Sequence, residues 1–328
     1  MSATATRRAG EHMWSDEEFE RITGPYRREL MTHCYRMLGS VHDAEDLLQE
    51  VMLRAWRASG DYDERRASPR TWLYRIATNA CLTALDQRGR RALPSGLTGP
   101  SDDPDAGPQR RLPEVTWLEP VPDALADPAA VVASRGGIRL AFVAALQHLP
   151  PRQRAVLILR EVLAWRASEV AGLLETSVAA VNSALQRARA QLAQAAPAED
   201  DLLEPDDPAC RDLLDRYVAA FEKADVEALE RLLREDAVLE MPPFLSWFSG
   251  REAFGGFIRW VCATRGPWRM VPTRANGQPA LAAYLDGGDG VFRAHSLQVL
   301  AIAEDGIARN VVFGDPALFA VFSLPPTA

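Results

Sequence analysis

The amino-acid sequence predicts a multidomain protein, with two all-α domains, of which the second is a helix-turn-helix, followed by an α+β domain. Apolar residues recur at helical spacing through residues 14–91 and 134–195, whereas short alternating runs dominate after residue 270. Stretches rich in proline and acidic residues, 92–133 and 196–207, interrupt these patterns. They predict linkers, so that the third domain covers residues 208–328.

Composition and charge are those expected of an intracellular globular protein. The chain has 328 residues, 47% of them hydrophobic, with no apolar run that suggests a signal peptide or a membrane span. Its 4 cysteines are scattered and lie apart from the 5 histidines, so we expect a reduced cytoplasmic protein without metal or cofactor. The net charge of -8 argues against free DNA binding, but arginine concentrates in residues 65–91 and 152–189.

A helix expected over residues 41–59 has an acidic face. Its apolar stripe includes Ala44, Leu47 and Val51, at helical spacing. Another face carries acidic and amide side chains, namely Asp43, Asp46, Gln49 and Glu50. This face predicts a docking surface, and a merely solvated helix face is the alternative.

A second helix is expected to begin at Pro69, with Ser68 as its cap. Trp72 lies on its apolar side and is expected in the core. Aromatic, basic and amide side chains project elsewhere and lead into a basic tail; they are Arg70, Tyr74, Arg75, Asn79, Arg88, Arg90 and Arg91. Such a surface suits the capture of an unstacked base, with the tail arginines binding phosphate.

Residues 168–189 predict the helix-turn-helix, with a tight turn at 175–177. The apolar face of the second helix is expected to contain Val178, Val181, Leu185, Ala188 and Leu192. Its other face carries Ser177, Ala179, Asn182, Ser183, Gln186, Arg187 and Arg189. Amides pair with adenine, and arginine pairs with guanine or phosphate, so this face suits the DNA major groove. A helical hairpin within an ordinary bundle has the same periodicity and remains the alternative.

Several motifs occur in a fixed order along about the first three-fifths of the chain. They are DAEDLLQEVMLRAW at 43–56, SPRTWLYRIATN at 68–79, RGRR at 88–91 and LPPRQRAVL at 149–157. Together with the helix-turn-helix, they resemble the extracytoplasmic-function group of bacterial RNA polymerase sigma factors. The resemblance implies that the acidic helix binds the clamp helices of the largest polymerase subunit. It also implies a contact with the polymerase flap and recognition of the −10 and −35 promoter elements by the two helical domains.

The third domain is expected to contain three helices and a curved sheet. The helices cover 211–221, 226–233 and 251–263, and extended segments cover 237–243, 270–274, 279–286, 290–301 and 306–313. YVAAFEKADVEALERLLREDAVLEMPP and FSGREAFGGFI resemble the polyketide-cyclase-like (SnoaL-like) cone, in which helices and a bent sheet enclose a pocket. The candidate pocket residues are Asp215, Tyr217, Trp247, Phe248, Trp260 and His295.

This combination resembles the SigG-like and SigJ-like actinobacterial sigma factors, whose C-terminal domain looks like a built-in regulator. The sequence TSVAAVNSALQRAR at 176–189 carries much of the resemblance. Asn182 and Ala184 stand where the broader pattern usually has a lysine and an arginine. This departure implies an unusual −35 preference and weaker phosphate anchoring.

We therefore expect a transcription initiation factor rather than an enzyme. Intramolecular contact or a small-molecule ligand of the C-terminal domain would set its activity, and no membrane partner is expected. The alternatives are a cyclase- or isomerase-like enzyme fused to a DNA-binding module and a repressor that works without polymerase. A repressor has little use for the acidic helix, and no acid–base pair is fixed by the sequence. The linker 92–133 is expected to follow a basic channel of the polymerase.

Overall fold

The computed structural model describes residues 14–86, 89–108, 112, 114–128, 137–195 and 201–328. The chain divides into two compact units. The first unit comprises Met1–Arg88 and Leu149–Ala193, and the second comprises Gly89–His148 and Gln194–Ala328. Most of the two helical segments expected as separate domains thus share one unit. The expected linker belongs with the C-terminal domain, and so do the residues before Leu149 that were expected to open the second helical domain. No helix within the described ranges is long and apolar enough to cross a membrane.

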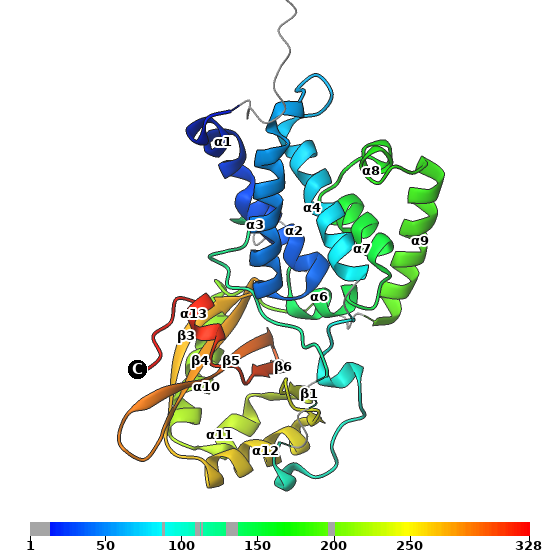
Figure 1. The fold of residues 1–328 in the computed structure, drawn as a ribbon. Coiled ribbons are helices and arrows are strands. Elements are labelled where there is room, and N and C mark those ends of the chain that lie inside the picture. Colours follow the sequence, from blue (N-terminus) through cyan, green and yellow to red (C-terminus); the bar gives the residue numbers. More distant parts are fainter. Residues whose placement is uncertain (1–13, 87–88, 109–111, 113, 129–136, 196–200) are drawn as a thin grey trace, which may run out of the picture. The chain divides into compact units, whose positions relative to one another are not determined.

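The first unit is helical (Figure 1). Its elements are α1 (Asp16–Thr23), α2 (Arg27–Leu38), α3 (Val41–Arg57), α4 (Pro69–Asp86), α7 (Pro151–Leu157), a π-helical stretch (Ile158–Val162), α8 (Ala167–Leu173) and α9 (Val178–Ala195). Helices α2, α3 and α4 pack against one another and bury Leu30, Val51 and Leu73. The Ser40 hydroxyl caps α3 by accepting a hydrogen bond from the Asp43 backbone N–H at 3.1 Å.

Helix α7 packs against α2 and α4 through a buried arginine. The Arg154 side chain is 3% exposed and donates to the carbonyls of Met37 and Leu149. Burial lowers the pKa of this guanidinium to about 10, because the charged form has lost its hydration. The side chain therefore ties a helix of the later segment to the earlier helices.

The helix-turn-helix has the expected tight turn. Helix α8 ends at Leu173, Glu175 adopts a left-handed conformation with a φ of 51°, and α9 begins at Val178. Ser177 caps α9, since its hydroxyl accepts from the Ala180 N–H at 3.1 Å. The prediction that Val178 is buried is wrong, because its side chain is 44% exposed. As the first residue of α9, it points beyond the helix end, where no turn lies beneath it.

The second unit is built on a six-stranded sheet in the order β2-β1-β6-β5-β4-β3. The strands are β1 (Leu233–Glu240), β2 (Trp247–Ser249), β3 (Trp268–Ala275), β4 (Gln278–Asp286), β5 (Phe292–Ala303) and β6 (Gly306–Phe313). Strands β1 and β6 are parallel, and the other neighbours are antiparallel. The predicted fold class is confirmed, although β1 begins earlier than expected and β2 was not expected.

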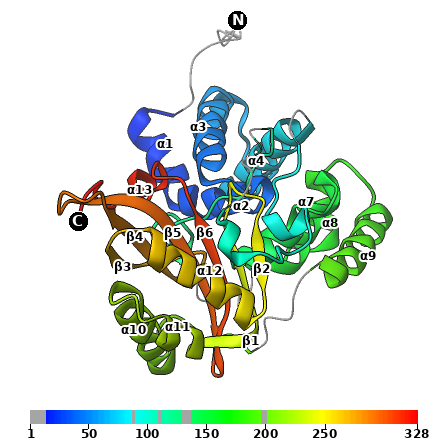
Figure 2. The same cartoon turned by 90° about the horizontal axis from the view of Figure 1, so that it is seen from below.

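Both faces of the sheet are covered. Helices α10 (Pro208–Glu222), α11 (Val226–Arg231) and α12 (Arg251–Thr264) lie on one side (Figure 2). On the other, α6 (Leu140–Leu146) meets β4, where the Leu140 N–H donates to Gln278 Oε1 at 2.8 Å. Tyr284 of β4 packs edge-on against Phe319 of the short helix α13 (Leu318–Val321), with ring centroids 5.1 Å apart. Strand β4 is consequently buried over most of its length.

The turn between β3 and β4 is the two-residue Asn276-Gly277. Both residues have positive φ values, 59° and 65°, as a type I′ hairpin turn requires. Asn276 is nonetheless fully buried rather than exposed as a hairpin tip usually is. Residues of the linker cover it.

Candidate polymerase and DNA surfaces and the C-terminal pocket

The acidic face of α3 is accessible. Asp46, Gln49 and Glu50 are exposed, whereas Asp43 is half-buried. These acids border a hollow of about 370 Å³ whose other wall comes from α4. Glu50 pairs with Arg54 at 2.5 Å, so part of its charge is balanced within the helix. An acidic, concave surface of this kind suits a basic helical partner.

Tyr74 does not project from α4 as predicted, because it is fully buried. Its hydroxyl donates to the Glu29 carboxylate of α2 at 2.9 Å. Burial, followed by the nearby Glu29 charge, raises the pKa of this phenol well above its usual value. The partner that holds Tyr74 inward lies 45 residues earlier in the chain.

Two arginines of α4 contact Trp165 and Glu175, in the segment that leads to α9 within the first unit. Arg70 pairs with Glu29, and its guanidinium lies 5.7 Å from the ring centroid of Trp165. Arg75 pairs with Glu175 in the turn before α9. Part of the predicted −10 surface is therefore occupied by the chain itself.

The remaining residues of the predicted −10 surface differ in their surroundings. Asn79 is exposed on α4. Arg90 and Arg91 belong to the second unit, where Arg91 donates to the Trp117 carbonyl at 2.5 Å and pairs with Glu119 at 3.6 Å. Arg88 lies outside the described residues.

Helix α9 exposes the predicted −35 face as one surface. Its exposed residues are Ser177, Ala179, Asn182, Ser183, Gln186, Arg187 and Arg189, whereas Val181, Leu185 and Ala188 are buried. Arg187 donates to the Ser183 hydroxyl at 2.6 Å, and Arg189 pairs with Glu161 at 2.6 Å. Val178 adds an exposed apolar side chain one helical turn before Asn182. Sequence periodicity did not reveal that Val178 is exposed, because apolar spacing does not show at which residue a helix begins.

The linker between the helical segments lies on the C-terminal domain. The Ser95 N–H donates to Glu240 at 3.0 Å, and the same carboxylate pairs with Arg309 at 2.6 Å. Trp247 donates from its indole nitrogen to the Thr98 carbonyl at 2.9 Å. Linker and domain thus form one packed structure, which the aperiodic sequence of the linker did not indicate.

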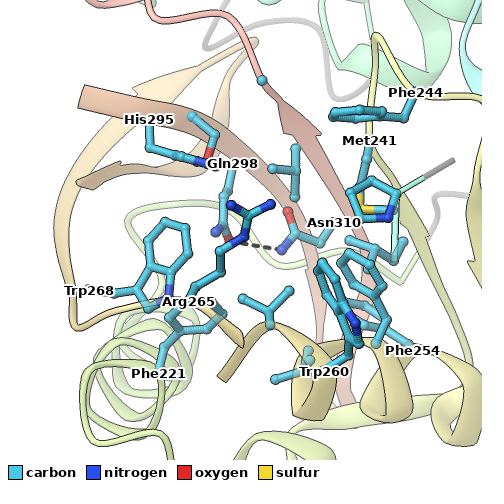
Figure 3. A pocket seen from close by; sticks show the side chains of 18 of the residues that line it. Phe221, Met241, Phe244, Phe254, Trp260, Arg265, Trp268, His295, Gln298 and Asn310 are labelled. Carbon is cyan, nitrogen blue, oxygen red and sulfur yellow. Dashed lines mark hydrogen bonds between the residues drawn. The ribbon is translucent and has the colours of Figure 1, made fainter. Parts of the chain in front are cut away.

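A cavity of about 340 Å³ opens between α12 and the sheet of the second unit (Figure 3). Tyr217, Trp260 and His295 line it. The prediction for three other residues needs correction, since Asp215, Trp247 and Phe248 are not among its lining. Asp215 is exposed on the outer face of α10, Trp247 binds the linker, and Phe248 stacks on Phe257 in the core.

A hydrogen-bonded triad forms the polar part of the cavity. Asn310 donates to Gln298 at 2.9 Å and to the Tyr217 hydroxyl at 3.2 Å, and that hydroxyl donates to Gln298 at 3.1 Å. His295 packs edge-on against Trp268, with centroids 4.9 Å apart. Burial, followed by the Arg265 charge, lowers the pKa of His295. This shift favours the neutral imidazole.

The lining residues do not supply a carboxylate. Within the described part of the chain, no group of three or more His, Cys, Asp or Glu side chains is arranged to hold a metal ion. A neutral histidine without a nearby acid is a weak basis for proton-transfer catalysis.

Comparison with known proteins identifies three domains along the chain. Residues 24–91 match the Sigma-70 region 2 model, residues 139–192 match Sigma-70 region 4, and residues 214–310 match a SnoaL-like domain. The chain is 52% identical to the ECF RNA polymerase sigma factor SigG of Mycobacterium tuberculosis, over 94% of this chain and 84% of that one. SigJ of the same species is 31% identical, over 87% and 86% of the two chains.

A solved structure covers nearly the whole chain. The crystal structure of Mycobacterium tuberculosis SigJ matches with a TM-score of 0.63 and 26% identity, and the match covers 95% of this chain and all of that one. The helical first unit and the α+β second unit are thus both found in a relative of known structure. The chain belongs to the extracytoplasmic-function family of RNA polymerase sigma factors.

Proposed function

We propose that this sigma factor brings core polymerase to promoters through α3, α4 and α9, and that its C-terminal domain regulates this activity by holding the linker. The observation that carries the proposal is the single exposed face of α9, which gathers amide, hydroxyl and arginine side chains beside a buried apolar face. Such a face suits the edges of bases in the major groove. Val178 adds an apolar contact of the kind that thymine methyl groups accept.

The acidic face of α3 is the proposed contact with the clamp helices of the largest polymerase subunit. Asp46 and Glu50 are exposed and lie on one side of the helix, above a hollow shared with α4. Opposite charge across an interface mainly speeds association and selects the partner. A flap contact by the region 4 segment and binding to promoter DNA complete the proposed set of partners.

The internal contacts of α4 suggest how the −10 surface is controlled. Arg70 and Arg75 contact Trp165 and Glu175 in the segment that leads to α9. These contacts must open before either arginine reaches DNA. Because the Arg75–Glu175 pair is solvent-exposed, it contributes little stability and opens at a small cost. We propose that polymerase binding separates the two segments.

Regulation by the C-terminal domain rests on the docked linker. The linker contacts β1, β2 and the β3–β4 turn of that domain. A linker held there is unavailable for a polymerase channel, so release from the domain is the proposed regulatory step. The alternative of an enzyme fused to a DNA-binding module has less support, because the cavity supplies no acid–base pair.

Transcription with purified components tests the proposal. Core polymerase with the full chain is compared with core alone, and with a variant that lacks the linker segment 113–123. We expect the full chain to start RNA at defined promoters, and the deletion to impair initiation more than core binding. Normal initiation by the deletion would leave the linker as a tether only.

A further inference from the structure

The cavity of the C-terminal domain has a largely aromatic interior. Phe221, Phe254, Trp260 and Trp268 line it together with Met241 (Figure 3). Its volume is about 340 Å³. This size lies at the lower end of the range for small-molecule sites. The walls therefore suit a planar apolar body of one or two rings.

Gln298 presents a hydrogen-bond donor to this apolar space. Its oxygen already accepts from Tyr217 and Asn310, which fixes the orientation of the amide. The amide nitrogen then has no acceptor within the described residues, although the side chain is only 4% exposed. The Gln298 amide nitrogen can therefore donate a hydrogen bond to a group bound in the cavity.

Arg265 adds a positive charge at the same cavity. Its side chain lines the cavity, and its guanidinium lies 5.8 Å from the ring centroid of Trp260. The cavity lining contains neither aspartate nor glutamate. The Arg265 charge and the Gln298 amide donor suit a negatively charged acceptor, whereas the buried Asn310 Oδ1, which has no donor among the described residues, suits an additional hydrogen-bond donor on the same ligand.

We propose that the cavity binds a flat, apolar carboxylic acid, whose carboxylate accepts hydrogen bonds from Arg265 and Gln298 while its ring body lies among the aromatic side chains. Guanidinium–carboxylate hydrogen bonds are short and charge-assisted, which gives them both strength and direction. This inference deepens the proposed regulatory function and rests on it for its biological purpose.

The linker forms part of the same cavity. Pro108 contributes to the lining, and the neighbouring Gly107 packs so closely on Trp260 that a Cβ atom there would lie 2.6 Å from the indole ring. Gly107 also has a φ of +69°, so glycine is required on both grounds. A bound acid would therefore touch the linker as well as the domain, and would favour the docked arrangement if it contacts Pro108 there.

Two probes of nearly equal shape test the ligand class. 2-Naphthoate carries the carboxylate, and 2-naphthamide replaces it with a neutral amide. Isothermal titration of each into the full chain is expected to show binding of the naphthoate roughly tenfold tighter than of the naphthamide, the size of a partly exposed charge-assisted contact. Equal affinities, or no binding of either probe, would overturn the proposal.

Variants assign the preference to one side chain. Arg265 is exposed, so Arg265→Gln is expected to fold and to abolish the tenfold preference, whereas Arg265→Lys retains most of it. Arg216→Gln removes an exposed arginine of α10 outside the cavity and is the matched control. A preference that survives Arg265→Gln would contradict the assignment. Because these titrations contain no polymerase, they test ligand binding independently of the transcription tests of the regulatory function.

Discussion

Asn276 connects Val121 of the linker and Ile138, just before α6, to the β3–β4 turn. Its side-chain oxygen accepts from the Val121 N–H at 3.0 Å, and its backbone N–H donates to the Val121 carbonyl at 2.9 Å. Its side-chain nitrogen donates to the Ile138 carbonyl at 2.9 Å. Val121, Ile138 and Asn276 are each at most 1% exposed. Removing this side chain should therefore loosen the docked linker.

Asn276→Gly is the informative substitution, because glycine adopts the φ of 59° without strain. It leaves the Val121 N–H and the Ile138 carbonyl buried without these partners, at about 1–3 kcal/mol each. The linker should therefore lose roughly 2–6 kcal/mol of docking free energy. The lower value corresponds to about a 30-fold increase in the open population.

Hydrogen exchange with mass spectrometry of peptides from residues 114–126 measures this opening. We expect exchange at Val121 to accelerate at least about 30-fold in Asn276→Gly, with the amides of β4 still protected. Asp305→Gly, at an exposed turn between β5 and β6, is the matched control and should leave the linker unchanged. Wild-type protection of Val121 in Asn276→Gly would refute the role of Asn276 in docking.

Three further predictions concern the first unit. Replacing Asp46 and Glu50 by lysine should weaken core polymerase binding without unfolding the protein, because both side chains are exposed on α3. Unchanged affinity in a pull-down titration would contradict the polymerase contact. Asn182→Ala should relax preference at one or two −35 positions by about 1–3 kcal/mol, whereas Arg187→Ala should weaken all promoters alike, as binding to a set of −35 variants will show. Burial lowers the pKa of His33 to about 3. As the pH falls below about 6.5, His33 is therefore protonated in the unfolded state but not in the folded state, and the free energy of unfolding should decline by up to about 1.4 kcal/mol per pH unit. Urea unfolding between pH 6.5 and 4.5 should show a shallower decline for His33→Asn; equal slopes would exclude His33 as the cause.

Local patterns predicted the helix-turn-helix because its determinants are local. The apolar spacing of Val181, Leu185 and Ala188 predicted the buried face correctly. The tight turn lies where it was expected, with Glu175 in a left-handed conformation. Val178 was misplaced since periodicity does not mark where a helix begins. Strand β2 was not predicted for a different reason, because its three residues are too few to show an alternating pattern.

Distant partners explain the remaining errors. Tyr74 is held inward by Glu29, a contact between separate helices that spacing along α4 does not encode. Asp215 precedes the pocket residue Tyr217 by two positions, which places it on the opposite side of α10. The docking of the linker depends on Asn276, more than a hundred residues later, and its own sequence has no period from which to infer it.

The central claim is that this chain confers promoter-specific initiation on core polymerase. The most direct measurement is transcription of fragmented genomic DNA by core polymerase with and without the full chain, with the RNA 5′ ends sequenced. We expect discrete start sites that require the chain and share two sequence elements at constant spacing, with Asn182→Ala relaxing only the upstream element. Identical start sites with and without the chain, or start sites that share no elements, would contradict the account.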